Sequence, residues 1–512
     1  MGVAWETLAG AARRQAPARV HAAAPRLHRS AVRSKLSVMA PRILLVNPPI
    51  YDFAAYDFWV KPYGLLSVAG QLRGRAEMRL FDYLERETAG AVQAADDSPP
   101  ARSGPGAPRR DRWGRGKFPC EVVPTPEPLA RIPRRYRRYG RPRQSFQDFL
   151  RAEAPFDFAL IQTGMTYWYL GVQEVIQDIR RLSPRTKIVL GGVYATLCPA
   201  HARTLRADLV IAGARLAPLW ELLGVAPDPS GLPFWESYGR SKIGVLKLTD
   251  GCPFQCTYCC VPRVYPGFAP RRTERVLAEL ELLCKLGARD VAFYDDALLF
   301  EPASAMVPFV AGARRRGLNV NFHTPNALHA RLISKDLARL MVGAGFKTFY
   351  LGFESTEQSW HARTGQKLTC AEFAKAVETL LDAGADAGQV TAYVLLGHPD
   401  TTSRSVEASM RVVHGLGVRV MLSEFSPLPG TPDGERCRAW VDLDEPLLHN
   451  KTAFPIILFG NGEVNRLKQL CRELNAARRS AIPGPRLDSR AFPGGAADGL
   501  LPSRSTSFQS RT

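Results

Sequence analysis

The sequence predicts an α/β protein in which an N-terminal doubly wound parallel sheet is followed by a partial (βα)6 barrel. Two observations predict this architecture. Short apolar runs of strand length alternate with helical segments, and six consecutive strand–helix repeats follow a stretch rich in Pro and Gly. Most runs of the first series are continuously apolar, which is typical of strands covered by helices on both faces. With 512 residues and 46% hydrophobic content, the chain has room for two or three globular domains.

The first sheet is predicted from short apolar runs that end at Pro, Gly or polar residues. These runs cover residues 43–47, 78–82, 157–163, 187–190 and 208–211. Helical patterns over 62–73 and 172–182 lie between them. Ligands of such sheets bind beyond the carboxyl ends of the strands, which here are Asn47, Thr163 and the pair Gly191 and Gly192.

The barrel is predicted from a second series of strands, each followed by a loop or helix. Its strands cover residues 245–249, 290–294, 319–323, 347–351, 389–396 and 419–424. Its helices cover residues 273–286, 303–316, 334–343, 371–383 and 403–416. Six repeats indicate an open barrel rather than a closed eight-fold one. One more amphipathic helix is expected over 462–479.

These patterns divide the chain into segments. We expect a disordered extension at 1–41, a sheet domain at 42–223 with an irregular insertion at 88–145, a linker at 224–240, the barrel at 241–435, a helical segment at 436–480 and a disordered tail at 481–512. Residues 1–38 have the composition of a transit peptide. Alternatively they precede a true start at Met39, which we favour slightly because Met39 leads straight into a strand.

The net charge of +20 is concentrated in three segments. Residues 1–42, 101–143 and 475–512 carry +7, +10 and +4, so the remainder is nearly neutral. Such segments are usually solvated, and a basic arm for an acidic partner is the minority interpretation. Within the insertion, residues 134–139 mix Arg with Tyr, which fits either a solvated loop or a strip that contacts phosphates. We expect no nucleic-acid partner.

The scattered cysteines and the absence of long apolar runs indicate a cytoplasmic protein. Ten Cys occur and most are isolated, which is not the pattern of a disulfide scaffold. No apolar run reaches the roughly 18 residues that would span a bilayer, so we expect no membrane association.

The strongest motif is Cys252-Pro-Phe-Gln-Cys256-Thr-Tyr-Cys259, directly after the first predicted barrel strand. Thiolates are the natural ligands of iron–sulfur clusters, and three of them leave one iron of a cubane without a protein ligand. An open coordination position is what a catalytic metal site needs. The alternatives are inert thiols or a structural zinc site, for which the adjacent Cys260 is expected to point away.

This loop resembles that of the radical S-adenosylmethionine (SAM) superfamily, including the aromatic residue before its last Cys, here Tyr258. The resemblance implies a [4Fe–4S] cluster on Cys252, Cys256 and Cys259, whose open iron chelates SAM. It also implies reductive cleavage of SAM to a 5′-deoxyadenosyl radical, with an electron donor such as flavodoxin or ferredoxin. The cofactor carries this chemistry, and the protein supplies orientation and exclusion of water.

The resemblance also implies SAM contacts at the ends of later strands. Tyr258, Asp296, Glu354, Ser355 and Gly397 are the positions that it indicates. Two of these positions have plainer interpretations, because Asp295 and Asp296 could be solvated carboxylates and Ser355 could be a helix cap. His398 could be a base, although a single loop His is more often structural.

Residues 42–220 resemble the cobalamin-binding domain that precedes the radical SAM core in one large class. The resemblance is carried by residues 43–49, 62–69 and 191–194. It implies cobalamin contacts by Asn47, Thr163, Gly191, Gly192 and Tyr194. The DxHxxG motif of many cobalamin proteins is absent, so a bound cobalamin would have no lower His ligand. Residues 165–169 are either an apolar wall for it or, as we favour, interdomain core.

Three functions are compatible with these features. The leading one is radical SAM chemistry, with cobalamin-dependent C-methyl transfer to a small molecule or peptide as one outcome. The second is RNA methylthiolation, which the basic insertion and the loop 426–432 suggest. That reaction normally needs a second cysteine trio, and residues 42–223 contain only Cys120 and Cys198. The third is a zinc-stabilised binding protein without catalysis.

Overall fold

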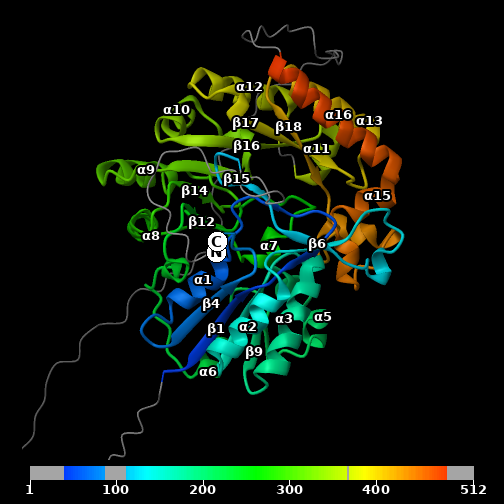
Figure 1. Cartoon of the computed structure of the whole chain (residues 1–512). Coiled ribbons are helices and arrows are strands. Elements are labelled where there is room, and N and C mark those ends of the chain that lie inside the picture. The colour runs from blue at the N-terminus through cyan, green and yellow to red at the C-terminus, as the bar shows by residue number, and fades with distance from the viewer. Residues whose placement is uncertain (1–39, 87–110, 366–367, 481–512) are drawn as a thin grey trace, which may run out of the picture. The chain divides into compact units, whose positions relative to one another are not determined.

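The computed structural model describes residues 40–86, 111–365 and 368–480 (Figure 1). The predicted tail 481–512, most of the predicted extension and the first part of the insertion lie outside these residues. The boundaries between the expected domains therefore stay predictions.

The first sheet has five parallel strands in the order β10-β9-β8-β1-β4. They are β1 (Arg42–Asn47), β4 (Glu77–Asp82), β8 (Phe158–Thr163), β9 (Lys187–Gly192) and β10 (Leu209–Ile211). Side chains of β1 alternate between two apolar cores. Leu44 and Val46 pack with α2 (Arg143–Glu153) and α3 (Tyr169–Leu182), whereas Ile43 and Leu45 pack with α1 (Tyr63–Gly70) and α6 (Ala217–Leu223). The sheet is therefore doubly wound, as predicted.

The strand order places a topological switch point between β1 and β8. The chain leaves β1 for β4 on one side and continues from β8 to β9 and β10 on the other. In open α/β sheets of this flavodoxin-like order, ligands bind outside the carboxyl ends of the strands at this point. Asn47 and Thr163 are the last residues of the two strands.

The second sheet has six strands in the order β11-β14-β15-β16-β17-β18, all parallel. They are β11 (Ile243–Leu246), β14 (Asp290–Phe293), β15 (Asn321–His329), β16 (Phe346–Glu354), β17 (Val390–Leu396) and β18 (Arg419–Glu424). The helices between them are α8 (Thr273–Lys285), α9 (Met306–Arg315), α10 (Lys335–Gly343), α12 (Cys370–Asp382) and α13 (Ser403–Gly415). β11 and β18 are the two edges of this sheet, so the predicted open (βα)6 barrel is confirmed.

Shorter elements and one long helix complete the described chain. The strands are β2 (Ile50–Asp52), β3 (Tyr56–Asp57), β5 (Gly116–Lys117), β6 (Cys120–Val122), β7 (Arg137–Tyr139), β12 (Thr249–Asp250) and β13 (Ala269–Pro270). The α-helices are α4 (Val193–Leu197), α5 (Pro199–Thr204), α7 (Val261–Val264), α11 (Gln358–Thr364), α14 (Pro432–Arg436), α15 (Ala453–Phe459) and α16 (Asn461–Ser480). The 3-10 turns are Glu127–Leu129, Thr166–Trp168, Trp235–Tyr238, Ala330–Leu332, Ala387–Gln389, Cys437–Ala439 and Pro446–His449.

The insertion differs from the expected irregular loop over residues 111–145. β7 pairs with both β2 and β6, and β5 pairs with β3. Arg138 lies in β7, is 3% exposed and forms a bidentate ion pair with Glu174 of α3 at 2.7 and 2.9 Å. Tyr136 and Tyr139 are buried as well. The interpretation of residues 134–139 as a phosphate-contacting strip is therefore wrong for these side chains, because they face the protein interior.

The first sheet contacts the barrel through a buried carboxyl group, that of Glu279 on α8. Glu279 accepts hydrogen bonds from the Tyr63 hydroxyl of α1 at 3.1 Å and from the Trp235 indole at 2.9 Å. Burial raises the pKa of Glu279 to about 7, although the two hydrogen bonds and the nearby Arg271 oppose the shift. The interface therefore contains a carboxyl group that titrates near neutral pH.

We expect the substitution Glu279→Gln to weaken the pH dependence of stability. The native state holds a proton on Glu279 that the unfolded chain releases near the ordinary glutamate pKa of 4.5, so this group lowers stability as pH rises from about 4.5 to about 7. The full loss is about 3 kcal/mol. Urea unfolding at pH 5 and pH 8 measures most of this loss. Glu274→Gln on the exposed side of α8 is the control, and an equal pH dependence in wild type and Glu279→Gln would contradict the assignment.

Candidate active site

The cysteine loop begins at a tight turn after β11. Gly251 has φ +71°, and a side chain there would meet the carbonyl oxygen of Gly267 at 1.9 Å, so only Gly fits. Before this turn, β12 pairs with β13 in an antiparallel ribbon. Within the loop, the amide of Cys259 donates to the carbonyl of Cys256 at 3.0 Å. The three predicted ligands thus lie on one compact loop beyond the carboxyl end of the first barrel strand.

The thiols of this loop influence one another. Burial raises the pKa of Cys259 to about 12, with smaller contributions from Cys260, Cys256 and Cys252. Burial also raises the pKa of Cys260, and the nearby carboxylate of Asp296 adds to this shift. Among residues 40–86, 111–365 and 368–480, no three His, Cys, Asp or Glu side chains surround a point suited to a single metal ion. A [4Fe–4S] cubane does not require the three side chains to surround one point, because each thiolate binds a different iron.

Two aromatic side chains attach the loop to the barrel. Phe254 packs on His329 at the end of β15, with ring centroids 4.3 Å apart. Tyr258 stacks on the buried Trp360 of α11 at 5.7 Å. Burial raises the pKa of Tyr258 well above its ordinary value, and Glu354, Cys256 and Cys259 add to the shift. Tyr258, Glu354 and two of the cysteines therefore converge on one site.

A carboxylate beside the loop has one oxygen available. Oδ1 of Asp295 accepts hydrogen bonds from the amides of Leu248 and Thr249 and from the Thr249 hydroxyl, at 2.9, 2.6 and 2.7 Å. Its Oδ2 is buried without a hydrogen-bond partner among the described residues. Burial raises the pKa of Asp295 to about 6. The resemblance indicates the adjacent Asp296, which is half-buried, and two consecutive Asp residues carry no local signal that decides between them.

Glu354 occupies a strained position at the end of β16. Its φ of +66° is rare for a residue with a side chain, and the register with β17 shifts between Gly352 and Glu354. Glu354 is 7% exposed. Backbone strain of this kind costs of order 1–3 kcal/mol and is concentrated at functional sites. This strained residue is a buried carboxylate that lies close enough to Tyr258 of the cysteine loop to raise its pKa.

Three of the predicted site residues make contacts within the protein that are explained by structure alone. They are Ser355, Gly397 and His398. The Ser355 hydroxyl accepts from the amide of Glu357 at 3.1 Å, but it does not cap α11, because the N-cap residue is Glu357 and no side chain caps this helix. A side chain at Gly397 would lie 2.6 Å from Pro455, so this Gly permits close packing on α15. The His398 ring is fully buried and both of its nitrogens are hydrogen-bonded. This arrangement supports the structural interpretation of His398.

The residues predicted at the end of the first sheet lie together, but the polar groups of most of them already form hydrogen bonds within the protein. Asn47 donates to Asp82 at 2.8 Å, Thr163 donates to the Gly191 carbonyl at 3.1 Å, and Tyr194 bonds to His201 at 2.6 Å. Gly192 has φ +119°. Gly191 differs, because nothing lies within 4 Å of the position that a side chain would take there. It leaves open space at the sheet end.

Residues 165–169 pack against the C-terminal segment, as the interdomain alternative predicts. The Trp168 indole donates to the buried Asp52 at 2.9 Å, and the Thr166 hydroxyl bonds to His449 at 2.9 Å. Tyr167 is 1% exposed, whereas Met165 is 46% exposed. Only Met165 of this segment presents a large apolar side chain to solvent.

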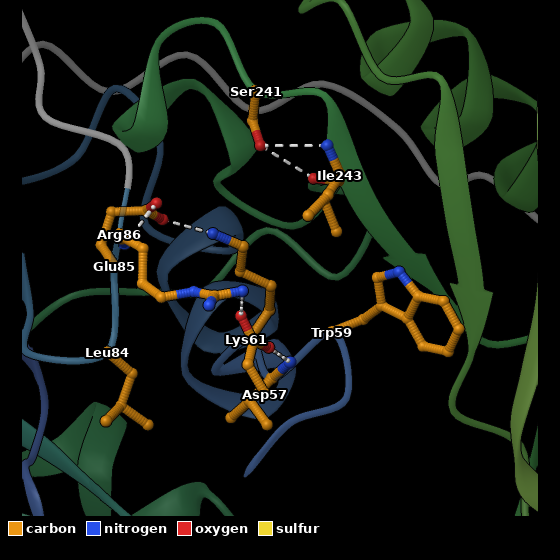
Figure 2. A pocket seen from close by; sticks show the side chains of 9 residues that line it. Asp57, Trp59, Lys61, Leu84, Glu85, Arg86, Ser241 and Ile243 are labelled. Atoms are coloured by element: carbon orange, nitrogen blue, oxygen red, sulfur yellow. Dashed lines mark hydrogen bonds and ion pairs between the residues drawn. The ribbon is translucent and has the colours of Figure 1, made fainter. Parts of the chain in front are cut away.

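A separate small pocket lies at the opposite end of β11 (Figure 2). Figure 2 shows Lys61 directed toward Glu85 and Arg86 directed toward Asp57, and the second pair is 2.7 Å apart. None of the predicted site residues lines this pocket. Its charges are paired with each other, so it adds nothing to the cysteine site.

The fold thus combines a flavodoxin-like parallel sheet with a partial barrel that carries three thiols on one loop. Residues 246–413 match the family described as Radical SAM superfamily. The chain thus contains a radical SAM domain, which confirms the resemblance and implies a [4Fe–4S] cluster and SAM.

Three similar proteins illustrate the match. An uncharacterized methyltransferase from Pyrococcus horikoshii is 25% identical over 37% of this chain and 40% of its own length. The threonylcarbamoyladenosine tRNA methylthiotransferase MtaB from Thermotoga maritima is 23% identical over 51% of this chain and 64% of its own. The matches thus span less than two thirds of these relatives. The third is the radical SAM methyltransferase TsrM from Kitasatospora setae, whose structure was solved with cobalamin and a [4Fe–4S] cluster bound. Its TM-score is 0.58 at 16% sequence identity, and the match covers 84% of this chain and 91% of the TsrM chain.

The described helices give no candidate for a transmembrane segment, since none is both long and apolar enough to cross a bilayer.

Proposed function

We propose that this chain is a radical SAM enzyme in which Cys252, Cys256 and Cys259 hold a [4Fe–4S] cluster. The observation that carries the proposal is the position of these thiols on one loop beyond the first strand of an open barrel that matches the radical SAM family. When bound, the cluster supplies the electron that cleaves SAM. The protein's part is to bind SAM, orient it and exclude water.

The carboxylates beside the loop are the proposed SAM contacts. Asp295 offers a buried oxygen without a partner among the described residues, which suits the amino group of SAM. Glu354 is buried and lies in the same site as Tyr258. Asp296 stays a candidate at the edge of the site, whereas the contacts of Ser355 and Gly397 favour positioning roles.

We further propose that the first sheet binds cobalamin and that the reaction is C-methyl transfer. Support comes from the switch point between β1 and β8, the open space beside Gly191 and the fold shared with TsrM. Met165, exposed at the same sheet end, offers an apolar surface to a flat ligand. The substrate would be a small molecule or peptide, and flavodoxin or ferredoxin in a reducing cytoplasm would supply electrons.

RNA methylthiolation is a second candidate, favoured by the similarity to the tRNA methylthiotransferase MtaB. The available thiols weigh against it. In the sheet region, Cys120 is exposed on β6 whereas Cys198 is buried after α4, so they do not resemble a second cluster site. Steep salt dependence of RNA affinity would support this candidate.

The test is to reconstitute the full chain anaerobically with iron, sulfide and cobalamin. We expect about four iron atoms per chain, in line with a cubane. We also expect SAM-dependent release of 5′-deoxyadenosine and a retained corrin absorption band. An iron cluster without a corrin band would remove cobalamin and leave the radical SAM assignment. Zinc without iron would contradict the whole proposal and favour a zinc-stabilised binding protein.

A further inference from the structure

A buried hydrogen-bonded array lies behind the cysteine loop. It consists of Trp360 on α11, His398 after β17 and Asp433 on α14, all less than 5% exposed. The Trp360 indole donates to Nδ1 of His398 at 3.1 Å, and the amide of Asp400 donates to the same atom at 3.1 Å. Because an indole N–H only donates, Nδ1 is an acceptor and the ring carries its proton on Nε2. That proton is donated to Oδ2 of Asp433 at 3.0 Å.

The array contacts the cysteine loop at Thr257, which directly follows the proposed cluster ligand Cys256. The Thr257 hydroxyl donates to the same Oδ2 of Asp433. The amide of Asp433 donates to the Thr257 carbonyl at 3.1 Å. The amide of Thr257 in turn donates to the carbonyl of Thr364 on α11 at 3.4 Å. Every polar group of Thr257 is therefore bonded to a residue outside the loop.

On the side away from the cysteine loop, the array forms ion pairs with partly exposed charged residues. Arg436 donates to Oδ1 of Asp433 at 3.0 Å and forms a two-point contact with Asp400 at 2.9 and 2.6 Å. Arg363 approaches Asp400 at 3.7 Å. The two oxygens of Asp433 thus serve different partners: one faces the loop and the other faces an exposed Arg. These bonds join α11, the end of β17 and α14 behind the loop.

We propose that His398 and Asp433 are positioning residues that fix the cysteine loop through Thr257 for cluster and SAM binding. This inference rests on the proposed function for its catalytic meaning. If only the cluster held the loop, cluster binding would have to supply the conformational entropy lost when the loop becomes ordered. A loop that other residues already fix avoids this cost. Partners beyond the direct ligands of a metal site typically change affinity or activity by about ten- to a hundredfold.

The matched variants are Thr257→Val and Thr257→Ser. Val preserves the shape but removes the hydroxyl donor, whereas Ser keeps the donor. The first measurement is hydrogen exchange of the amides of Thr257, Cys259 and Asp433 in metal-free protein. We expect Thr257→Val to exchange at least about tenfold faster at these positions, and Thr257→Ser to restore the wild-type rates. Equal exchange in Val and Ser variants would overturn the inference, whatever the fate of the cluster.

The second measurement uses the reconstituted protein. We expect Thr257→Val to keep its iron but bind SAM about ten- to a hundredfold more weakly, with an altered electron paramagnetic resonance spectrum of the reduced cluster in the presence of SAM. His398→Gln, which can still donate to Asp433 and accept from Trp360, is expected to retain more SAM affinity than His398→Phe. Unchanged SAM affinity and spectrum in both Thr257→Val and His398→Phe would overturn the positioning role. If wild-type protein takes up no cluster, the proposed function fails, and hydrogen exchange alone decides the inference.

Discussion

Replacing Cys252, Cys256 or Cys259 by Ala is expected to reduce SAM cleavage to background. In the proposed cluster each thiolate holds a separate iron, so the loss of one would open a second corner of the cubane and expose it to disassembly. Iron and sulfide content and 5′-deoxyadenosine release after anaerobic reconstitution measure the effect.

Cys260→Ala is the matched control for these variants. Cys260 adjoins Cys259 in the chain, is half-buried like the other three, and lies within the field of Asp296. We expect this variant to bind the wild-type amount of iron and to cleave SAM. If Cys260→Ala fails as the other variants do, or if any one of the three retains full cleavage, the ligand assignment is wrong.

The second large effect is expected on stability, from the substitution Arg138→Ala. The guanidinium of Arg138 and the carboxylate of Glu174 are each 4% exposed, and the bidentate contact neutralises both. Removing Arg138 leaves the carboxylate of Glu174 buried beside the Tyr51 hydroxyl, which still donates to it at 2.6 Å but carries no charge. Breaking a buried pair in this way costs about 3–5 kcal/mol. Urea unfolding of the metal-free protein measures the loss.

Arg135→Ala, three residues earlier in the same basic stretch, is the control. Arg135 is exposed, so its removal is expected to change the free energy of unfolding by less than about 0.5 kcal/mol. The double variant Arg138→Leu with Glu174→Leu removes both buried charges and is expected to recover much of the loss. Equal effects of Arg135→Ala and Arg138→Ala would show that the buried pair does not contribute as described.

The strands could be predicted because their signal is local. Ile43 to Val46 form an uninterrupted apolar run, and burial on both faces of the sheet requires nothing more of the sequence. The barrel strands are less uniformly apolar, but their order in the sheet follows the order of the chain. Short connections between parallel neighbours leave few alternative topologies, so the fold class follows from the alternation alone.

Features that depend on distant partners could not be predicted. The ion pair between Arg138 and Glu174 joins positions 36 residues apart, and the basic stretch by itself is typical of a solvated loop. The choice between Asp295 and Asp296 depends on which carboxylate turns toward Leu248 and Thr249. The bond between His398 and Asp433 needs the loop after β18 to return to the cysteine loop, and no spacing in the sequence encodes that return.

The buried Asp52 has a consequence for synthesis on the ribosome. Its carboxylate accepts from Phe53 and Trp168 nearby, but also from Asn450, which is 398 residues later in the chain. At about 5–20 residues per second, about 20–80 seconds pass between the translation of Asp52 and that of its last partner. Until then, the Asp52 carboxylate must stay hydrated. The contact between residues 165–169 and the segment that contains Asn450 can form only after that segment is translated.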